Sequence, residues 1–211
     1  MAFIFDLDGT LLNSLDDMMN SLNQVLEAHN LETHDREAYQ KFVGNGMKKL
    51  VERACPNGYT NNEVILQEFL EVYKERYYEL SRPYPGITDM LRDLNKRNIP
   101  IGICTNKKQE YTDKIIELFF NDIEFVSVIG DRFEGKEKPN SYYPLLIAKE
   151  MNKEPHDIYF VGDSDVDILT AINSDMIPVG VSWGFRSVDE LKGTGASYIV
   201  DSASEVLQLL K

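Results

Sequence analysis

Aspartates occur at two places in the sequence where they could act together. Asp6 and Asp8 follow the apolar run FIF and precede Gly9, while Asp163 follows a second apolar run, IYFV. Two carboxylates about 4 Å apart repel each other by about 4 kcal/mol at an effective dielectric of 20. If these acids meet, they need a divalent cation with oxygen ligands, and Mg²⁺ is the usual partner of carboxylates that act on phosphate.

Asp6 is the candidate nucleophile. A carboxylate is already charged and needs no base to activate it, so its attack on a phosphate ester would form an acyl phosphate and divide one difficult step into two. Phosphoryl transfer otherwise asks the protein mainly for positioning and charge neutralisation. Asp8 is the candidate acid and base, because an acid two residues on could protonate the leaving alkoxide and later deprotonate the attacking water.

Two other segments carry polar residues where apolar runs end. Thr105 and Asn106 follow IGIC, and Lys138 stands before a proline in a later loop. Each of them alone is more typical of a turn or of a solvated surface than of a site. Their significance depends on the fold, because a parallel sheet brings the carboxyl ends of its strands to one rim, where ligands bind. Lys138 at that rim would offset part of the negative charge.

The elements that would position these residues alternate along the second part of the chain. We expect short apolar strands at 3–7, 99–104, 125–129, 158–161, 177–181 and 198–200. Helices are expected between them, at 87–97, 109–119, 141–151 and 165–173, and a last one at 204–210. Short apolar strands separated by helices predict an α/β fold, a doubly wound parallel sheet of the Rossmann-like type.

Residues 13–85 interrupt this alternation. They show helical spacing from Ser14 to Leu26 and again at 35–43, 47–54 and 62–80, with no convincing strand. The breaker-rich segment SRPYPG at 81–86 is typical of a hinge. We therefore expect a core domain of residues 1–12 and 86–211, and an all-helical cap domain of residues 13–85 inserted after the first strand.

Composition limits the partners. The 211 residues carry 22 basic and 35 acidic side chains, a net charge of −13. Such a field disfavours nucleic acid and anionic membrane, so a small phosphorylated metabolite would have to be captured locally. No apolar run approaches the length of about 18–20 residues that crosses a bilayer. Cys55 and Cys104 are expected to be buried thiols in a reducing cytoplasm, in a protein that is a monomer or a homodimer.

The polar segments together resemble the motifs of the haloacid dehalogenase superfamily. Its phosphatases carry Asp-x-Asp-Gly-Thr after the first strand, here Asp6 to Thr10. A Ser or Thr that ends an apolar strand matches Thr105, and a lysine before proline matches Lys138. The fourth motif, Gly-Asp with a later Asp, matches Gly162-Asp163 and Asp167. All four occur in order, and the resemblance covers essentially the whole chain.

The resemblance implies a role for each matching position. Asp6 would be the nucleophile and a metal ligand, and Asp8 the acid/base that also offers its backbone carbonyl to Mg²⁺. Asp163 would complete the metal site. Asp167 would play a supporting role by holding Lys138. The phosphoryl oxygens would be bound by Gly9, Thr105, Asn106 and Lys138 together with Asp6.

The cap narrows the expected substrate. The segment VGNG at 43–46 and the segment VSWGF at 181–185 are similar to those of bacterial phosphoglycolate phosphatases. Lys48, Lys49 and Arg53 lie near the glycine turn and could meet a substrate carboxylate, although a solvated basic face would look the same. Pyrophosphatases and nucleotidases of the same branch share parts of these segments. A phosphosugar mutase of the β-phosphoglucomutase type would use the same strand-end residues and stays open.

Overall fold

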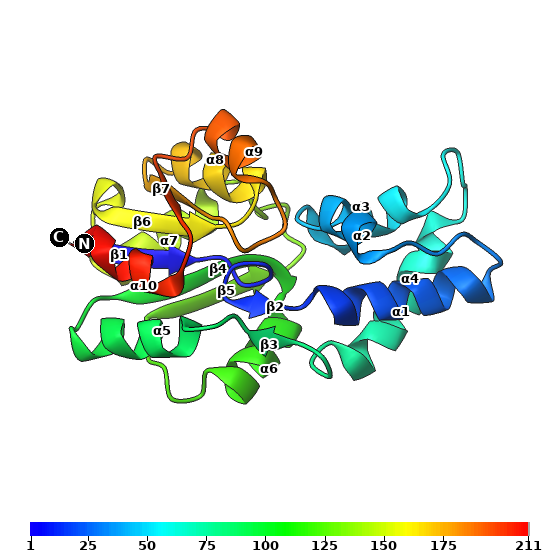
Figure 1. The fold of residues 1–211 in the computed structure, drawn as a ribbon, viewed down its shortest axis with the longest axis horizontal. Coiled ribbons are helices and arrows are strands. Elements are labelled where there is room, and N and C mark those ends of the chain that lie inside the picture. The colour runs from blue at the N-terminus through cyan, green and yellow to red at the C-terminus, as the bar shows by residue number, and fades with distance from the viewer. Residues whose placement is uncertain (211) are drawn as a thin grey trace. The chain divides into compact units, whose positions relative to one another are not determined.

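The protein, described here by a computed structural model that covers residues 1–210, divides into two compact units (Figure 1). One unit comprises Met1–Leu12 and Pro83–Lys211, and the other comprises Asn13–Arg82. The chain passes between the units at two short strands, β2 (Leu12–Asn13) and β3 (Arg82–Pro83), which pair with each other. The inserted unit therefore ends at Arg82 and not at residue 85, because β3, which pairs with β2, includes Pro83 of the proline-rich segment.

The larger unit is built on a parallel sheet of six strands in the order β5-β4-β1-β6-β7-β8. The strand β1 (Ala2–Phe5) lies inside the sheet, so the chain winds outward from it in both directions. The predicted doubly wound parallel sheet is confirmed. The remaining strands are β4 (Ile101–Lys108), β5 (Ser127–Asp131), β6 (Ile158–Gly162), β7 (Ile177–Val181) and β8 (Tyr198–Val200).

Helices cover both faces of this sheet (Figure 1). One face carries α5 (Ile87–Lys96), α6 (Gln109–Phe119) and α10 (Ala203–Val206), and the other carries α7 (Tyr142–Glu150), α8 (Asp165–Asn173) and α9 (Val188–Thr194). Single 3₁₀ turns lie at Pro155–Asp157 and Leu207–Leu210.

Side chains of the central strands alternate between two apolar layers. Ile4 and Phe160 belong to the core cluster that includes side chains of α7 and α8. Phe3 is turned the other way, and its ring stacks on those of Phe5 and Tyr159 at 5.7 and 5.2 Å between centroids. Because both faces of β1 are buried, the strand reads as a continuous apolar run and not as an alternating one.

One helix of the larger unit was not expected. The helix α9 begins at a capping box, in which the Ser187 hydroxyl accepts from the backbone N–H of Glu190 and the Glu190 carboxylate accepts from the backbone N–H of Ser187. The spacing Ser-x-x-Glu before a helical segment is the sequence signal that would have revealed it.

The smaller unit is all helical. Its helices are α1 (Leu15–Ala28), α2 (Arg36–Phe42), α3 (Gly46–Ala54) and α4 (Asn62–Arg76). The buried Asp17 of α1 accepts hydrogen bonds from the backbone N–H groups of Leu80 and Ser81 and from the Ser81 hydroxyl. These bonds tie the end of the insert to its first helix, and α4 accordingly stops at Arg76 instead of continuing to residue 80.

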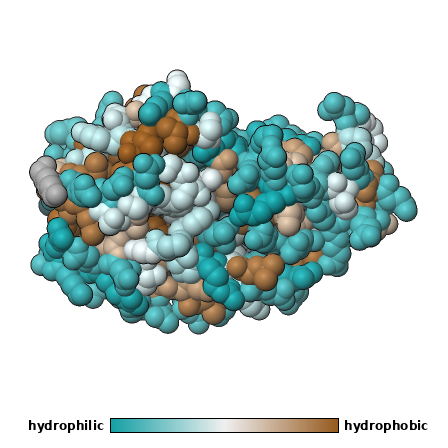
Figure 2. Space-filling view, in the orientation of Figure 1, coloured by the Kyte–Doolittle hydropathy of each residue, from teal (hydrophilic) through white to brown (hydrophobic). Residues whose placement is uncertain are grey.

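The surface shows no membrane-spanning feature. Within residues 1–210, no helix combines the length and the apolar character needed to span a bilayer. On the face shown in Figure 2, hydrophobic side chains form small separate patches among hydrophilic ones.

Candidate active site

Strand register brings the expected site residues to one rim of the sheet. Phe5 of β1 pairs with Ile103 of β4 and with Val161 of β6. Asp6 therefore stands at the end of β1, and its backbone N–H donates to the carbonyl of Val161 at 2.9 Å. Thr105 and Asp163 follow two residues beyond the paired positions on the two flanking strands. The rim lies at β1, where the winding changes direction, the usual ligand site of such sheets.

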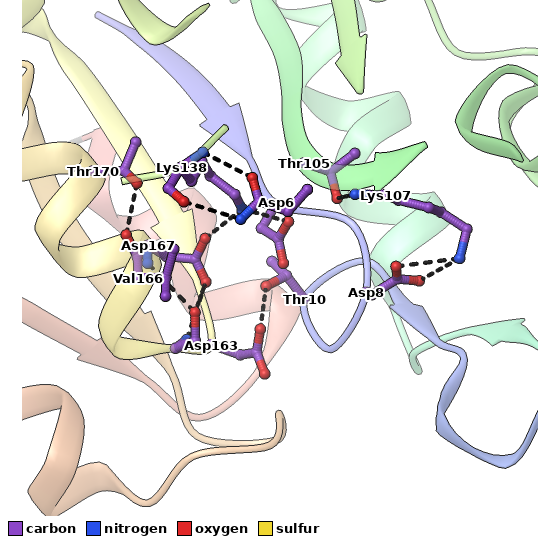
Figure 3. A network of polar contacts seen from close by, with 12 residues as sticks. Asp6, Asp8, Thr10, Thr105, Lys107, Lys138, Asp163, Val166, Asp167 and Thr170 are labelled. Atoms are coloured by element: carbon purple, nitrogen blue, oxygen red, sulfur yellow. Dashed lines mark hydrogen bonds and ion pairs between the residues drawn. The ribbon is translucent and has the colours of Figure 1, made fainter. Parts of the chain in front are cut away.

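Lys138 lies at the centre of the site (Figure 3). Its Nζ is 2.6 Å from Oδ1 of Asp6 and 2.6 Å from Oδ1 of Asp167, and all three side chains are buried. The expected contact between Asp167 and Lys138 is present. Asp167 is itself held at the start of α8, where its Oδ2 accepts from the backbone N–H and the hydroxyl of Ser164.

The loop after Lys138 is fixed by Asn106. The Asn106 side chain accepts from the backbone N–H of Lys138 at 2.8 Å and donates to its carbonyl at 3.1 Å. This amide therefore orients the lysine, and a phosphate contact from Asn106 would have to come from its backbone N–H group. The nearby Thr105 is buried, and its hydroxyl oxygen accepts from the backbone N–H of Lys107.

Asp163 is oriented by three neighbours. Its Oδ1 accepts from the Thr10 hydroxyl at 3.3 Å, and its Oδ2 accepts from the backbone N–H of Phe185 at 2.7 Å. Gly9 adopts a φ of 93°, and a side-chain carbon there would collide with the Asp163 carboxylate and the Phe185 ring. Only glycine allows the two loops to approach this closely.

The electrostatics of the cluster favour a cation. Burial raises the pKa of Asp6 to about 7; Lys138 opposes this shift, and Asp167 adds to it. Burial also raises the pKa of Asp163, with Asp167 and Asp6 adding to the shift. For Lys138, burial works against the charged form, but Asp167 and Asp6 outweigh it, so the pKa of this ammonium is raised. One lysine is thus set among three acids.

The arrangement fits a hard metal ion. Asp6, Asp163 and Asp167 each offer a carboxylate oxygen, and these atoms lie within 4.8 Å of one another. The two metal ligands expected from the sequence, Asp6 and Asp163, both belong to this group, and its third member, Asp167, contacts Lys138. The side chain of Asp8 lies outside this group. Asp8 is expected to bind the metal through its backbone carbonyl. An all-oxygen donor set of this kind suits Mg²⁺.

Asp8 has a cation of its own, which was not anticipated. The Nζ of Lys107 lies 3.1 Å from Oδ1 and 3.2 Å from Oδ2 of Asp8. Lys107 is the third residue of the segment TNK, one position beyond Asn106. A charged residue that directly follows two expected site residues on a strand is the signal that could have identified it.

The segment after β7 also takes part without having been assigned a role. The indole N–H of Trp183 donates to the carbonyl of Thr10 at 3.0 Å, and Phe185 holds Asp163. At Gly184 a side-chain carbon would collide with the Asp163 carboxylate. The segment 183–185 therefore supports both the loop after β1, at Thr10, and Asp163, which follows β6.

The cap cations lie within the smaller unit. Arg53 donates to the carbonyl of Phe42 and to the side-chain oxygen of Asn45, both at 2.7 Å, and so braces the glycine turn. Lys49 pairs with Glu52 at 2.6 Å on the surface. Lys48 is exposed on α3. A role for these three residues in binding substrate stays a prediction.

Comparison with known proteins identifies the family. The model of the haloacid dehalogenase-like hydrolases matches residues 3–181. The chain belongs to this family. The haloacid dehalogenase-like hydrolase resembles a phosphoglycolate phosphatase of Mesorhizobium japonicum at 30% identity over 86% of this chain and 82% of the relative. It resembles another from Vibrio parahaemolyticus at 27% identity over 98% of this chain and 94% of the relative.

Solved structures agree on the fold of this hydrolase. The crystal structure of a predicted phosphoglycolate phosphatase from Haemophilus somnus superimposes with a TM-score of 0.90 at 26% identity, covering 100% of this chain and 97% of the other. The resemblance seen in the four sequence motifs is therefore confirmed at the level of the family and the fold.

Proposed function

We propose that this hydrolase is a Mg²⁺-dependent phosphatase of small phosphate monoesters that works through a phosphorylated Asp6. The observation that carries the proposal is the ion pair between Lys138 and Asp6 at 2.6 Å, inside a buried group of three acids at the rim of the sheet. A nucleophilic carboxylate, a cation for the phosphoryl oxygens and a set of metal ligands are thereby gathered at one point.

In the first step an oxygen of Asp6 attacks phosphorus. The bond between phosphorus and the ester oxygen breaks, the electron pair stays on that oxygen, and the oxygen takes a proton from Asp8 to leave as an alcohol. Lys138 and the hydroxyl of Thr105 would bind the phosphoryl oxygens while Asp167 holds the lysine in place. A bound Mg²⁺ would supply charge neutralisation between Asp6, Asp163 and the phosphate.

In the second step water attacks the phosphorus of phosphorylated Asp6. Asp8, now a carboxylate, takes the proton of that water, and the bond between phosphorus and Asp6 breaks with its electrons returning to the Asp6 oxygen. Orthophosphate is released and Asp6 is a carboxylate again. Asp8 therefore gives one proton and takes one back in each turnover.

The substrate class rests on the relatives, which are named phosphoglycolate phosphatases, and on the expected cap residues. We infer a small phosphate ester that bears a carboxylate, with 2-phosphoglycolate as the first candidate. Lys48, Lys49 and Arg53 are the proposed contacts of the carboxylate. Cleavage of pyrophosphate or nucleoside monophosphates, and isomerisation of a phosphosugar, use the same core residues and are the alternatives to be tested.

The test is a panel of phosphate esters assayed with and without Mg²⁺. The purified enzyme should release orthophosphate from 2-phosphoglycolate in a Mg²⁺-dependent manner and should not convert β-glucose 1-phosphate into glucose 6-phosphate. A mutase would show the opposite result. If 2-phosphoglycolate is among the poorest substrates, the narrow substrate assignment fails and the phosphatase class remains.

Two variants test the roles of the acids. Asp6→Ala should abolish turnover, because no other side chain of the site can accept the phosphoryl group. Asp8→Asn should lower kcat by about 10²–10⁴-fold, the usual contribution of a positioned acid or base. Full Mg²⁺-dependent turnover by the Asp6→Ala variant would refute the proposed mechanism.

A further inference from the structure

Lys107 is an unusually placed charge. Its side chain is 0% exposed, although a lysine is almost never fully buried without a partner. Its Nζ contacts both oxygens of the Asp8 carboxylate, at 3.1 and 3.2 Å, and the Asp8 side chain is 18% exposed. The lysine is thus the more deeply buried partner of the pair.

The two lysines of the site serve different acids (Figure 3). Lys138 contacts Asp6 and Asp167, while Lys107 contacts Asp8. In the close-up, the Asp8 carboxylate is turned toward Lys107 and away from the group around Lys138. The carboxylate that exchanges protons is therefore held separately from the carboxylate that attacks.

Stability alone gives a weak reason for such a pair. Taking an ammonium out of water costs several kcal/mol, and well-packed apolar side chains often stabilise a protein as much as a buried ion pair does. A contact through both carboxylate oxygens does fix the orientation of the acid, which an apolar contact could not do.

We propose that Lys107 is a positioning residue that holds Asp8 as an oriented base for the attack of water on phosphorylated Asp6. The inference rests on the proposed phosphatase function. In that step the water oxygen bonds to phosphorus, its proton passes to Asp8, and the bond from phosphorus to Asp6 breaks. Lys107 transfers no proton and touches neither water nor phosphate in this scheme.

The experiment compares Lys107→Met with the wild type on 4-nitrophenyl phosphate, whose leaving group needs no proton, and on 2-phosphoglycolate. Because both substrates pass through the same phosphorylated enzyme, kcat should fall about tenfold or more on both. The value of kcat/KM for 4-nitrophenyl phosphate, which reports only the first step, should change by less than about threefold. A burst of nitrophenol and acid-trapped phosphoenzyme should both increase.

The matched control is Lys108→Met. Lys108 is the next residue of the strand, but it is partly exposed and pairs with Glu110 on the surface at 2.8 Å. Its removal should leave kcat, the burst and the phosphoenzyme level unchanged. Lys107→Arg keeps the charge and should recover part of kcat. If thermal unfolding shows that Lys107→Met does not fold, Lys107→Gln takes its place as the variant that removes the charge.

A double variant tests whether Lys107 acts through Asp8. Adding Lys107→Met to Asp8→Asn should cause no further loss of kcat, because the acid that the lysine orients is already gone. Additive losses would overturn the inference. Equal losses of kcat and kcat/KM for 4-nitrophenyl phosphate in Lys107→Met would also overturn the inference. So would a raised KM confined to 2-phosphoglycolate, because that result would make Lys107 a contact for the substrate carboxylate. A wild type without Mg²⁺-dependent phosphate release would instead refute the proposed function.

Discussion

At the scale of single residues, the site gathers several carboxylates around two buried lysines, Lys107 and Lys138. Asp6, Asp163 and Asp167 lie close enough to share a cation, and Lys138 is the cation that the chain itself provides. Burial raises the pKa of Asp6 to about 7, and the single ammonium of Lys138 does not offset this effect and that of Asp167. Mg²⁺ would supply the missing charge, which is why binding of the metal and ionisation of Asp6 should be linked.

The linkage predicts how the effect of Mg²⁺ depends on pH. The pKa of Asp6 is raised from 3.8 to about 7 in the folded protein, by burial first, with Lys138 opposing and Asp167 and Asp8 adding. The folded state then holds the proton more tightly than the unfolded state, so the metal-free protein loses stability as pH rises from about 4 through 7. A metal must displace that proton. The rise in Tm caused by Mg²⁺ should be larger at pH 8 than at pH 5.5.

Thermal unfolding with and without Mg²⁺ measures this difference, and calorimetry in buffers of different ionisation enthalpy should show proton release on binding near pH 6.5. The Asp6→Asn variant is the control: residue 6 then carries no proton to displace, so the pH dependence should shrink to the part that Asp163 contributes. A Mg²⁺ effect on Tm that is equal at both pH values in the wild type would contradict the assignment of Asp6 as a ligand.

At the scale of elements, helix starts and strand ends carry the site. The helix α8 begins with a capping box in which Ser164 and Asp167 exchange hydrogen bonds, and the same Asp167 holds Lys138. One set of contacts therefore starts the helix and orients Lys138, the proposed phosphate-binding lysine. The helix α9 begins with the same motif, made by Ser187 and Glu190 at an exposed position.

The N-cap residues of α8 and α9, Ser164 and Ser187, offer a matched pair of variants. Ser164→Ala and Ser187→Ala should each lower the free energy of unfolding by about 1 kcal/mol, the typical cost of losing an N-cap. Only Ser164→Ala should also lower kcat, by about tenfold, because Asp167 loses the partners that orient it. Urea unfolding and steady-state kinetics check both effects. A comparable loss of kcat in Ser187→Ala would show that the effect comes from general loosening of the fold.

At the scale of the whole molecule, the net charge of −13 opposes the substrate. Long-range repulsion between an acidic protein and a phosphate dianion slows their encounter, and salt screens it with a Debye length of about 10 Å at 0.1 M. Capture would then depend on Lys138 and on a bound Mg²⁺ at the buried site, where charges are screened less.

This balance predicts the response to salt. Raising NaCl from about 20 to 200 mM at constant free Mg²⁺ should leave kcat/KM for 2-phosphoglycolate unchanged or raise it by about two- to threefold, because the screened interaction is repulsive. A neutral co-solute at equal osmolality is the control. A steep fall of kcat/KM with salt would mean that exposed cations, such as Lys48 and Lys49 of the cap, dominate the encounter.

Much of the site followed from local sequence. The apolar runs before Asp6, Thr105 and Asp163 predicted parallel strands, and a parallel sheet must bring their ends to one rim whatever the details of packing. The contact of Asp167 with Lys138 followed from the family resemblance. The helix α9 and the true end of α4 were missed, since a capping box and a buried aspartate outweighed hydrophobic spacing there.

The sequence by itself determined the fold class and the residues that gather at the rim, because hydrophobic runs and strand order depend on neighbours along the chain. Only the tertiary structure decided which polar and charged groups contact one another. Three pairings join residues 22 to 99 positions apart: Lys107 with Asp8, Asn106 with the backbone of Lys138, and Phe185 with Asp163. Such pairings arise from packing and from the cost of burying a charge, and neither can be read from local pattern.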